Sequence, residues 1–131
     1  SKYNVVDEYF RVNLNGGGFR MPPKTIEGIP LTATQYNKMI ILMNTKELAI
    51  PGGKGKGNLL DYYKELITGN SQMSKSFKTN TLKGQKDQIA NIRSMYLTEA
   101  QMEIKKEIQG RIDKRNNYID LYGKSPARGD F

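Results

Sequence analysis

Apolar side chains recur every three or four residues in two parts of the chain's first half, which is the spacing of one face of a helix. The first part begins at Thr32, which has a capping-box partner in Gln35, and continues to about Asn44. The second follows an expected N-cap at Asn58 and ends near Gly69, where we expect a left-handed residue. The apolar positions are Tyr36, Met39, Ile40, Met43, Leu59, Leu60, Tyr63, Leu66 and Ile67. The pattern therefore predicts a pair of helices.

A third apolar stripe predicts the longest helix, from residue 85 to about residue 116, with residue 122 as its farthest end. Its apolar positions are Ile89, Ile92, Tyr96, Ala100, Ile104, Ile108 and Ile112. From Tyr96 onward the spacing is strictly four, so the stripe turns around a straight helix. One compact domain cannot cover a stripe that turns in this way. The C-terminal half of the helix is therefore expected to contact something other than the chain's own core.

The C-terminal part of this stripe is the first candidate partner-binding site. We expect Ile104, Ile108 and Ile112 to be exposed on the isolated chain and to contact other chains, because such a row on a soluble monomer usually marks an interface. The alternative is that the chain's own N-terminal segment folds back and covers them. The apolar residues of that segment are Val5, Tyr9 and Phe10.

The N-terminal part of the chain has a weaker pattern. Residues 2–12 suit an amphipathic helix slightly better than a strand, and three consecutive glycines follow that segment. Pro22, Pro23 and Pro30 then fix their own φ angles and keep the preceding residues out of the helical region. Residues 21–29 are therefore predicted to run extended.

The chain reads as one domain of 131 residues. Its successive parts are an N-terminal segment with the extended lead-in (1–31), a helical pair around a basic loop (32–69), a polar connection (70–84), the long helix (85–122) and a tail (123–131). The connection is predicted to be irregular, and its large apolar side chains are Met73, Phe77 and Leu82. We predict a mainly α fold of several helices with long Gly- and Pro-rich connections, completed by neighbouring chains.

The loop at residues 51–57 contains four glycines and two lysines and is the second candidate binding site. A phosphate-binding P-loop needs a Gly, four further residues and then Gly-Lys-Ser/Thr. Neither lysine fits, because a glycine follows each of them and the earlier position is Leu48 or Ile50. We therefore expect a flexible basic linker, in which Lys54 and Lys56 can contact nucleic-acid phosphate without sequence preference.

Composition argues against several kinds of site. The chain has no Cys and no His, and so lacks disulfides, thiolate metal ligands and the side chain that most often serves as acid or base near pH 7. No pair of acidic residues stands out by its spacing, and no apolar run approaches the ~18 residues of a membrane span. We therefore expect no enzymatic activity, no catalytic residue, no cofactor, no metal site and no membrane span.

The net charge of +8 favours anionic partners. Residues 24–84 carry nine Lys/Arg and four Asp/Glu, against nine and seven in residues 85–131, so the positive surplus lies in the middle of the chain. Eight tyrosines are interleaved with these charges and could stack on bases. Three of them, Tyr36, Tyr63 and Tyr96, fall on predicted apolar stripes and are expected in the core. The tyrosines not assigned to the core include Tyr3, Tyr62, Tyr118 and Tyr122.

The order of features along the chain is more telling than any single motif. It comprises the Met-Pro-Pro-Lys-Thr-Ile-Glu-Gly-Ile-Pro-Leu-Thr run at 21–32, Gln35-Tyr36, the helix at 39–44, the Gly-Lys-Gly loop, Leu59-Leu60, Gln88-Ile89, Ile92-Arg93 and Tyr96. Over about residues 9–105 this order resembles the C-terminal region of large virion proteins of tailed bacteriophages, of the tape-measure, internal or ejected structural type. The resemblance implies a non-enzymatic structural part of a phage particle, present in many copies or as a small ring or trimer. The chain is short for such a protein, and residues beyond Gly110 have no counterpart in the resemblance.

Two functions follow as hypotheses. The first is a structural or assembly component of a tailed-phage particle (tail, neck or internal virion protein), which contacts other virion proteins and forms homo-oligomers. It would lie in the virion, or in the host cytoplasm before assembly. The alternative is a small basic nucleic-acid-binding protein, packaged with or acting on DNA. Protein contacts should persist at high salt, whereas phosphate contacts weaken steeply.

Overall fold

The computed structural model describes residues 5–14, 19–53 and 55–127. Along this part of the chain the elements are α1 (Val5–Leu14), β1 (Thr25–Ile26), β2 (Ile29–Pro30), α2 (Ala33–Thr45), β3 (Leu48–Ala49), β4 (Lys56–Gly57), α3 (Leu59–Thr68), α4 (Gln72–Thr79) and α5 (Leu82–Tyr122). The prediction of a mainly α fold is confirmed. The described strands form two short antiparallel ladders, β1 with β2 and β3 with β4.

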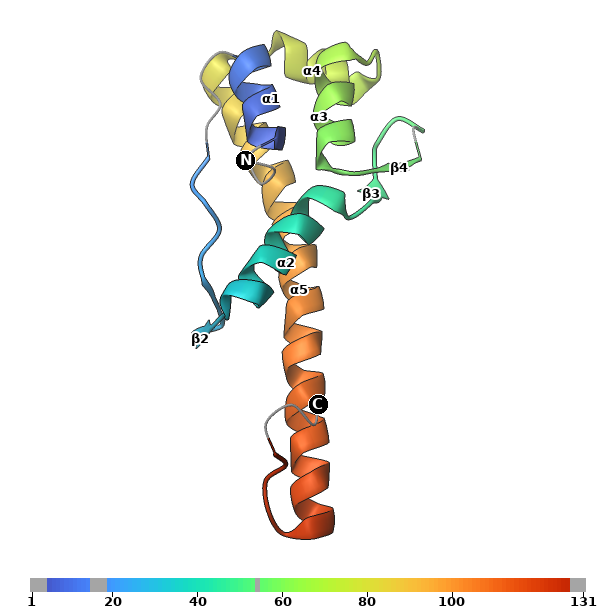
Figure 1. Cartoon of the computed structure of the whole chain (residues 1–131). Helices are drawn as coiled ribbons and strands as arrows, with labels where there is room; N and C mark the ends of the chain where they lie inside the picture. Colours follow the sequence, from blue (N-terminus) through green and yellow to red (C-terminus); the bar gives the residue numbers. More distant parts are fainter. Residues whose placement is uncertain (1–4, 15–18, 54, 128–131) are drawn as a thin grey trace.

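The other elements are arranged along α5, which runs through most of the molecule (Figure 1). α1, α3, α4 and the first turns of α5 form a head at one end, and α2 crosses α5 obliquely beside that head (Figure 1). The core takes buried side chains from every described helix. They include Val6 and Phe10 of α1, Met39, Ile40 and Met43 of α2, Leu59, Tyr63 and Leu66 of α3, Phe77 of α4, and Ile89, Ile92, Tyr96, Ala100 and Ile104 of α5. The C-terminal half of α5 projects away from this body (Figure 1).

The predicted starts of α2 and α3 are confirmed, whereas α5 begins at Leu82, three residues before the predicted start at residue 85. The Thr32 hydroxyl accepts a hydrogen bond from the Gln35 amide, and the Gln35 side chain accepts one from the Thr32 amide, at 3.1 and 2.9 Å. Asn58 makes the corresponding pair of hydrogen bonds with Asp61 at the start of α3. Each box satisfies amide groups that have no partner within the first turn.

The end of α3 differs from the prediction. Gly69 has φ −76° and ψ 173°, which is extended rather than left-handed. A Cβ atom at Gly69 would lie 2.6 Å from the Glu65 carbonyl oxygen. Glycine is therefore needed here for space, not for a positive φ.

The prediction of an irregular connection at residues 70–84 was wrong. Ser71 caps α4, and its hydroxyl accepts a hydrogen bond from the Ser74 amide at 3.2 Å. Phe77 is buried, whereas Leu82, an expected anchor, is exposed in the first turn of α5. An eight-residue helix that buries one large side chain has too little apolar periodicity to be recognised in a polar sequence.

Two tight hairpins also replace segments that were predicted to be extended or irregular. In the lead-in, β1 and β2 are joined by Glu27 and Gly28, whose φ angles are 49° and 79°. Positive φ at both central residues is the signature of a type I′ turn. In the basic loop, β3 pairs with β4, and the Ile50 amide donates to the Gly55 carbonyl at 2.8 Å. Short strands of two residues leave little alternation for a sequence pattern to show.

Candidate interaction surface on the long helix

α5 changes character at Ile104. From Ile89 to Ile104 it supplies six buried residues to the core, and beyond Ile104 none of its residues is buried. Ile108 is half-buried against the core, and Ile112 is 43% exposed. The remaining turns extend past α2, and residues 124–127 run back beside them (Figure 1). Residues 109–122, the outer half of α5, are thus the part of this helix that the other described helices leave uncovered.

Ion pairs mark the place where α5 leaves the body. Lys38 of α2 pairs with Glu107, and Lys46 pairs with Glu103 at 3.4 Å. On the side of the β1–β2 hairpin, Lys105 donates to Glu27 at 2.8 Å. These groups are largely exposed, so each pair contributes about 0–1 kcal/mol. Their position nevertheless shows that α2 and the hairpin cover α5 as far as Glu107.

The structure separates the three isoleucines predicted to form one exposed row. The expectation for Ile104 was wrong, because this side chain is 0% exposed within the chain's own core. Ile108 is intermediate, and Ile112 is exposed as expected. The element that covers the start of the row is α2, whereas the alternative named the N-terminal segment. That segment forms α1, which packs against α3 in the head.

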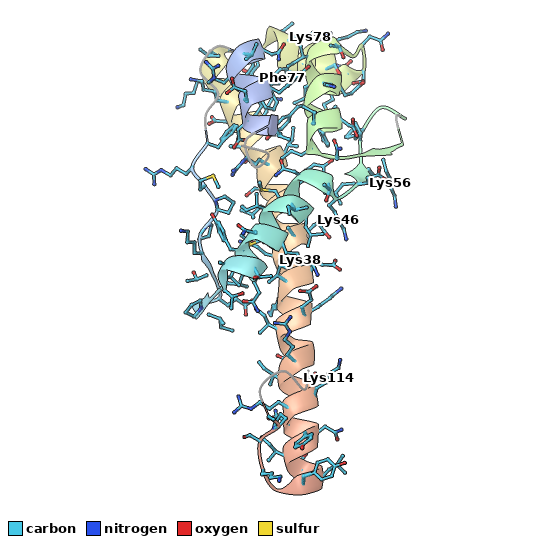
Figure 2. The ribbon with its side chains drawn as sticks, in the orientation of Figure 1. Lys38, Lys46, Lys56, Phe77, Lys78 and Lys114 are labelled. Carbon is cyan, nitrogen blue, oxygen red and sulfur yellow. The ribbon has the colours of Figure 1, made fainter. Side chains whose placement is uncertain are left out.

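The two lysines predicted as phosphate contacts have different outcomes. Lys54 lies outside the described residues. Lys56 is exposed on β4, at the β3–β4 hairpin and far from the outer half of α5 (Figure 2). The candidate apolar and basic positions therefore do not form one site.

The outer half of α5 has three distinct faces that were not recognised from the sequence. Arg111, Lys114 and Arg115 follow one another at spacings of three and four, and Tyr118 and Tyr122 continue that face. A second face carries Ile112 and Ile119. The acidic residues of this region, Asp113 and Asp120, are two turns apart on the side away from the basic row. These faces are visible in the helical spacing of the residues beyond Gly110, whereas the prediction for this region rested on its apolar residues alone.

A buried ion pair holds α1 in the head. The Arg93 guanidinium donates to the Asp7 carboxylate at 3.3 and 3.5 Å and lies 5.4 Å from the centre of the Phe19 ring. Both charged side chains are nearly buried, at 10% and 14% exposure. Burial raises the pKa of the Asp7 carboxyl, and the attraction of Arg93 offsets this only in part. This pair fastens α1 to α5, and neither residue was assigned a role from the sequence.

Shallow hollows lie along α5 on either side of Thr98. One has a volume of about 360 Å³ and is lined by Leu48, Met95 and neighbouring polar residues of α5. The other, of about 380 Å³, lies between the β1–β2 hairpin and Met102. Both are open to solvent. Among the described residues, Asp and Glu nowhere gather in a group of three or more that could hold a metal ion.

Neither a protein-family model, nor a curated protein, nor a solved structure matches this chain. Among the described helices, not one combines the length and apolar character needed to cross a membrane.

Proposed function

We propose that this protein is a structural or assembly component of a tailed-bacteriophage particle, and that it acts through protein–protein contacts of the outer half of α5. The phage context is supported by the resemblance over residues 9–105. The assembly role is supported by one structural observation, the projecting helix itself. In this proposal the protein needs no cofactor and catalyses no reaction, and it is located in the virion after assembly in the host cytoplasm.

The projecting segment has little packing from the described helices of its own chain. Residues 109–122 lie beyond the half-buried Ile108 and comprise fewer than four turns. The segment continues a packed helix and so needs no new nucleus, but most of the stability of a helix in a protein comes from packing of its amphipathic face. Gly110 lowers this further, since glycine inside a helix costs about 1 kcal/mol relative to alanine. A contact along Ile112 and Ile119 would supply the missing packing.

A second copy of the chain is the partner that we infer. The apolar face is narrow, and a helix with one such face is stabilised when a matching helix covers it. Copies of the same chain offer identical faces, and closed homo-oligomers are the usual assembly of soluble proteins. The resemblance implies a ring, a trimer or many copies, which agrees with this choice.

The test compares two isoleucines of similar exposure. Ile112 is 43% exposed on the outer half of α5, and Ile41 is 39% exposed on α2. We expect the wild-type chain to sediment as an oligomer at about 0.5 M salt, where interactions between exposed charges are screened. Ile112→Asp should sediment as a monomer whose urea midpoint equals that of the wild-type chain diluted to the monomer, whereas Ile41→Asp should still assemble. A wild-type chain that stays monomeric at every concentration would refute the proposal.

Helicity provides a second readout. If the outer half of α5 depends on a partner, diluting the wild-type chain below its dissociation constant should reduce the far-UV circular dichroism signal at 222 nm. Ile112→Asp should show the reduced signal at all concentrations. Equal helicity in all of these samples would show that residues 109–122 are stable alone and would remove the main argument for assembly.

A further inference from the structure

The outer half of α5 segregates its charges by sign. Arg111, Lys114 and Arg115 lie on one face at spacings of three and four and are all exposed. Asp113 is two residues from both arginines, which places it roughly on the opposite side of the helix. Asp120 lies two turns beyond Asp113 on that same side. The result is a basic face a little over one turn long, with Asp113 and Asp120 turned away from it.

Two tyrosines extend the basic face toward the end of the helix. Tyr118 and Tyr122 are four residues apart, and their ring centres are 4.6 Å from each other. Tyr122 is 64% exposed. Tyrosine hydroxyls are, with arginine and lysine, among the side-chain groups that commonly contact nucleic-acid phosphates.

The positive charges of the basic face are not paired with carboxylates of the described chain, unlike those of Lys38 and Lys105 nearer the body. Lys38 and Lys105 are paired with Glu107 and Glu27. Asp113 accepts a hydrogen bond from the Gln109 side chain at 3.0 Å. Within the part of the chain that the structure describes, the three cations of the basic face form no salt bridge. Figure 2 shows Lys114 on the projecting segment, well below α2.

We propose that this face binds the phosphates of double-stranded DNA without sequence preference. The charged contacts are Arg111, Lys114 and Arg115, and the hydroxyl of Tyr122 is a further donor. The projecting segment can approach a duplex because the body of the protein lies beyond its other end (Figure 1).

This proposal differs from the assembly role and uses different residues. The apolar face with Ile112 and Ile119 is adjacent to the basic face, so one helix can contact a second copy and a duplex together. It also moves the expected phosphate contact away from Lys56, which lies on the β3–β4 hairpin.

The experiment measures binding of a labelled 20-bp DNA duplex of mixed sequence by fluorescence anisotropy, at about 50–200 mM salt. The test variant is Arg111→Gln/Lys114→Gln/Arg115→Gln. Its control removes the same charge from exposed lysines elsewhere and is Lys56→Gln/Lys75→Gln/Lys83→Gln. Circular dichroism checks that both variants keep the helicity of the wild-type chain.

We expect the test variant to lose affinity and its log–log salt slope to flatten by up to about 2.7, which is 0.9 for each of three phosphate contacts. The control should keep the wild-type slope. Tyr122→Phe is expected to weaken binding roughly threefold, the effect of one lost hydrogen bond.

Three results would overturn the proposal. The wild-type chain could fail to bind the duplex, the control triple could weaken binding as much as the test triple, or a 20-nucleotide single strand could bind more tightly than the duplex. The last result would point to stacking of bases on tyrosine instead. Sedimentation tests the assembly proposal separately, so none of these three results contradicts it.

Discussion

Removing the hydroxyl from Tyr96 is expected to destabilise the fold, whereas removing the hydroxyl from Tyr63 is not. Tyr96 and Tyr63 are both 0% exposed. The Tyr96 hydroxyl donates to the Gly57 carbonyl at 2.7 Å and so joins α5 to β4. The Tyr63 hydroxyl is buried with no hydrogen-bond partner among the described residues. The same substitution, Tyr→Phe, therefore breaks a buried hydrogen bond in one case and removes an unpaired polar group in the other.

The expected magnitudes follow from these contacts. Tyr96→Phe removes the hydrogen bond to the Gly57 carbonyl, which also lies in the β3–β4 ladder, and this lowers the free energy of unfolding by about 0.5–1.5 kcal/mol. Burying an unpaired hydroxyl costs about 1–3 kcal/mol in protein mutational data. Tyr63→Phe recovers part of this cost, because the lost oxygen also leaves a small gap with fewer van der Waals contacts. We therefore expect Tyr63→Phe to be neutral or up to about 1 kcal/mol more stable.

Urea unfolding followed at 222 nm and pH 7 measures the difference. With an m-value of about 2 kcal/mol/M, a loss of about 1 kcal/mol moves the midpoint down by about 0.5 M. Measurements at two protein concentrations separate this effect from any change in assembly. The reasoning is refuted if Tyr63→Phe lowers the midpoint as much as Tyr96→Phe does.

Further predictions concern the caps, the glycines and pH. Thr32→Ala should lower the free energy of unfolding by about 1 kcal/mol through loss of the capping box, and an unchanged urea midpoint would contradict this. Gly57→Ala should cost about 1–3 kcal/mol, because a Cβ atom would lie 2.6 Å from Ile50 Cδ1 and 2.7 Å from Asp61 Cβ. Gly110→Ala should instead raise helicity at 222 nm, since a Cβ atom there meets nothing within 4 Å. Burial raises the pKa of the Tyr63 and Tyr96 hydroxyls. Their contribution to stability is therefore complete below pH ~10 and is lost as pH rises above that value; a flat urea midpoint from pH 9 to 11 would exclude this.

Local interactions explain why the helix starts could be predicted. A capping box involves residues three apart, so Thr32 with Gln35 and Asn58 with an acceptor in the next turn are visible in the sequence alone. The apolar stripe from Ile89 onward likewise identified α5, although the helix begins three residues before the predicted start. α4 was missed because its stability depends on contact with α3, including the hydrogen bond from the buried Ser74 hydroxyl to the Glu65 carbonyl at 2.7 Å.

The candidate site was predicted in part. The sequence placed an exposed surface on the C-terminal half of the long helix, and the structure has its uncovered surface there. The sequence could not show that Ile104 is buried and Ile112 exposed, because this difference depends on where α2 crosses α5. The basic face at Arg111 to Tyr122 could have been found from spacing, but only the structure shows that this segment projects from the body (Figure 1).

The sequence by itself determined the features that depend on neighbours within about four residues: the mainly α class, the caps of α2 and α3, the long helix and its mixed faces. Only the tertiary structure decided which of those faces are covered. The pairing of Asp7 with Arg93, of Lys38 with Glu107 and of Tyr96 with Gly57 joins residues 86, 69 and 39 positions apart. Such contacts depend on how whole helices cross. Crossing is decided by the combined packing of many side chains, which no local pattern of residues specifies.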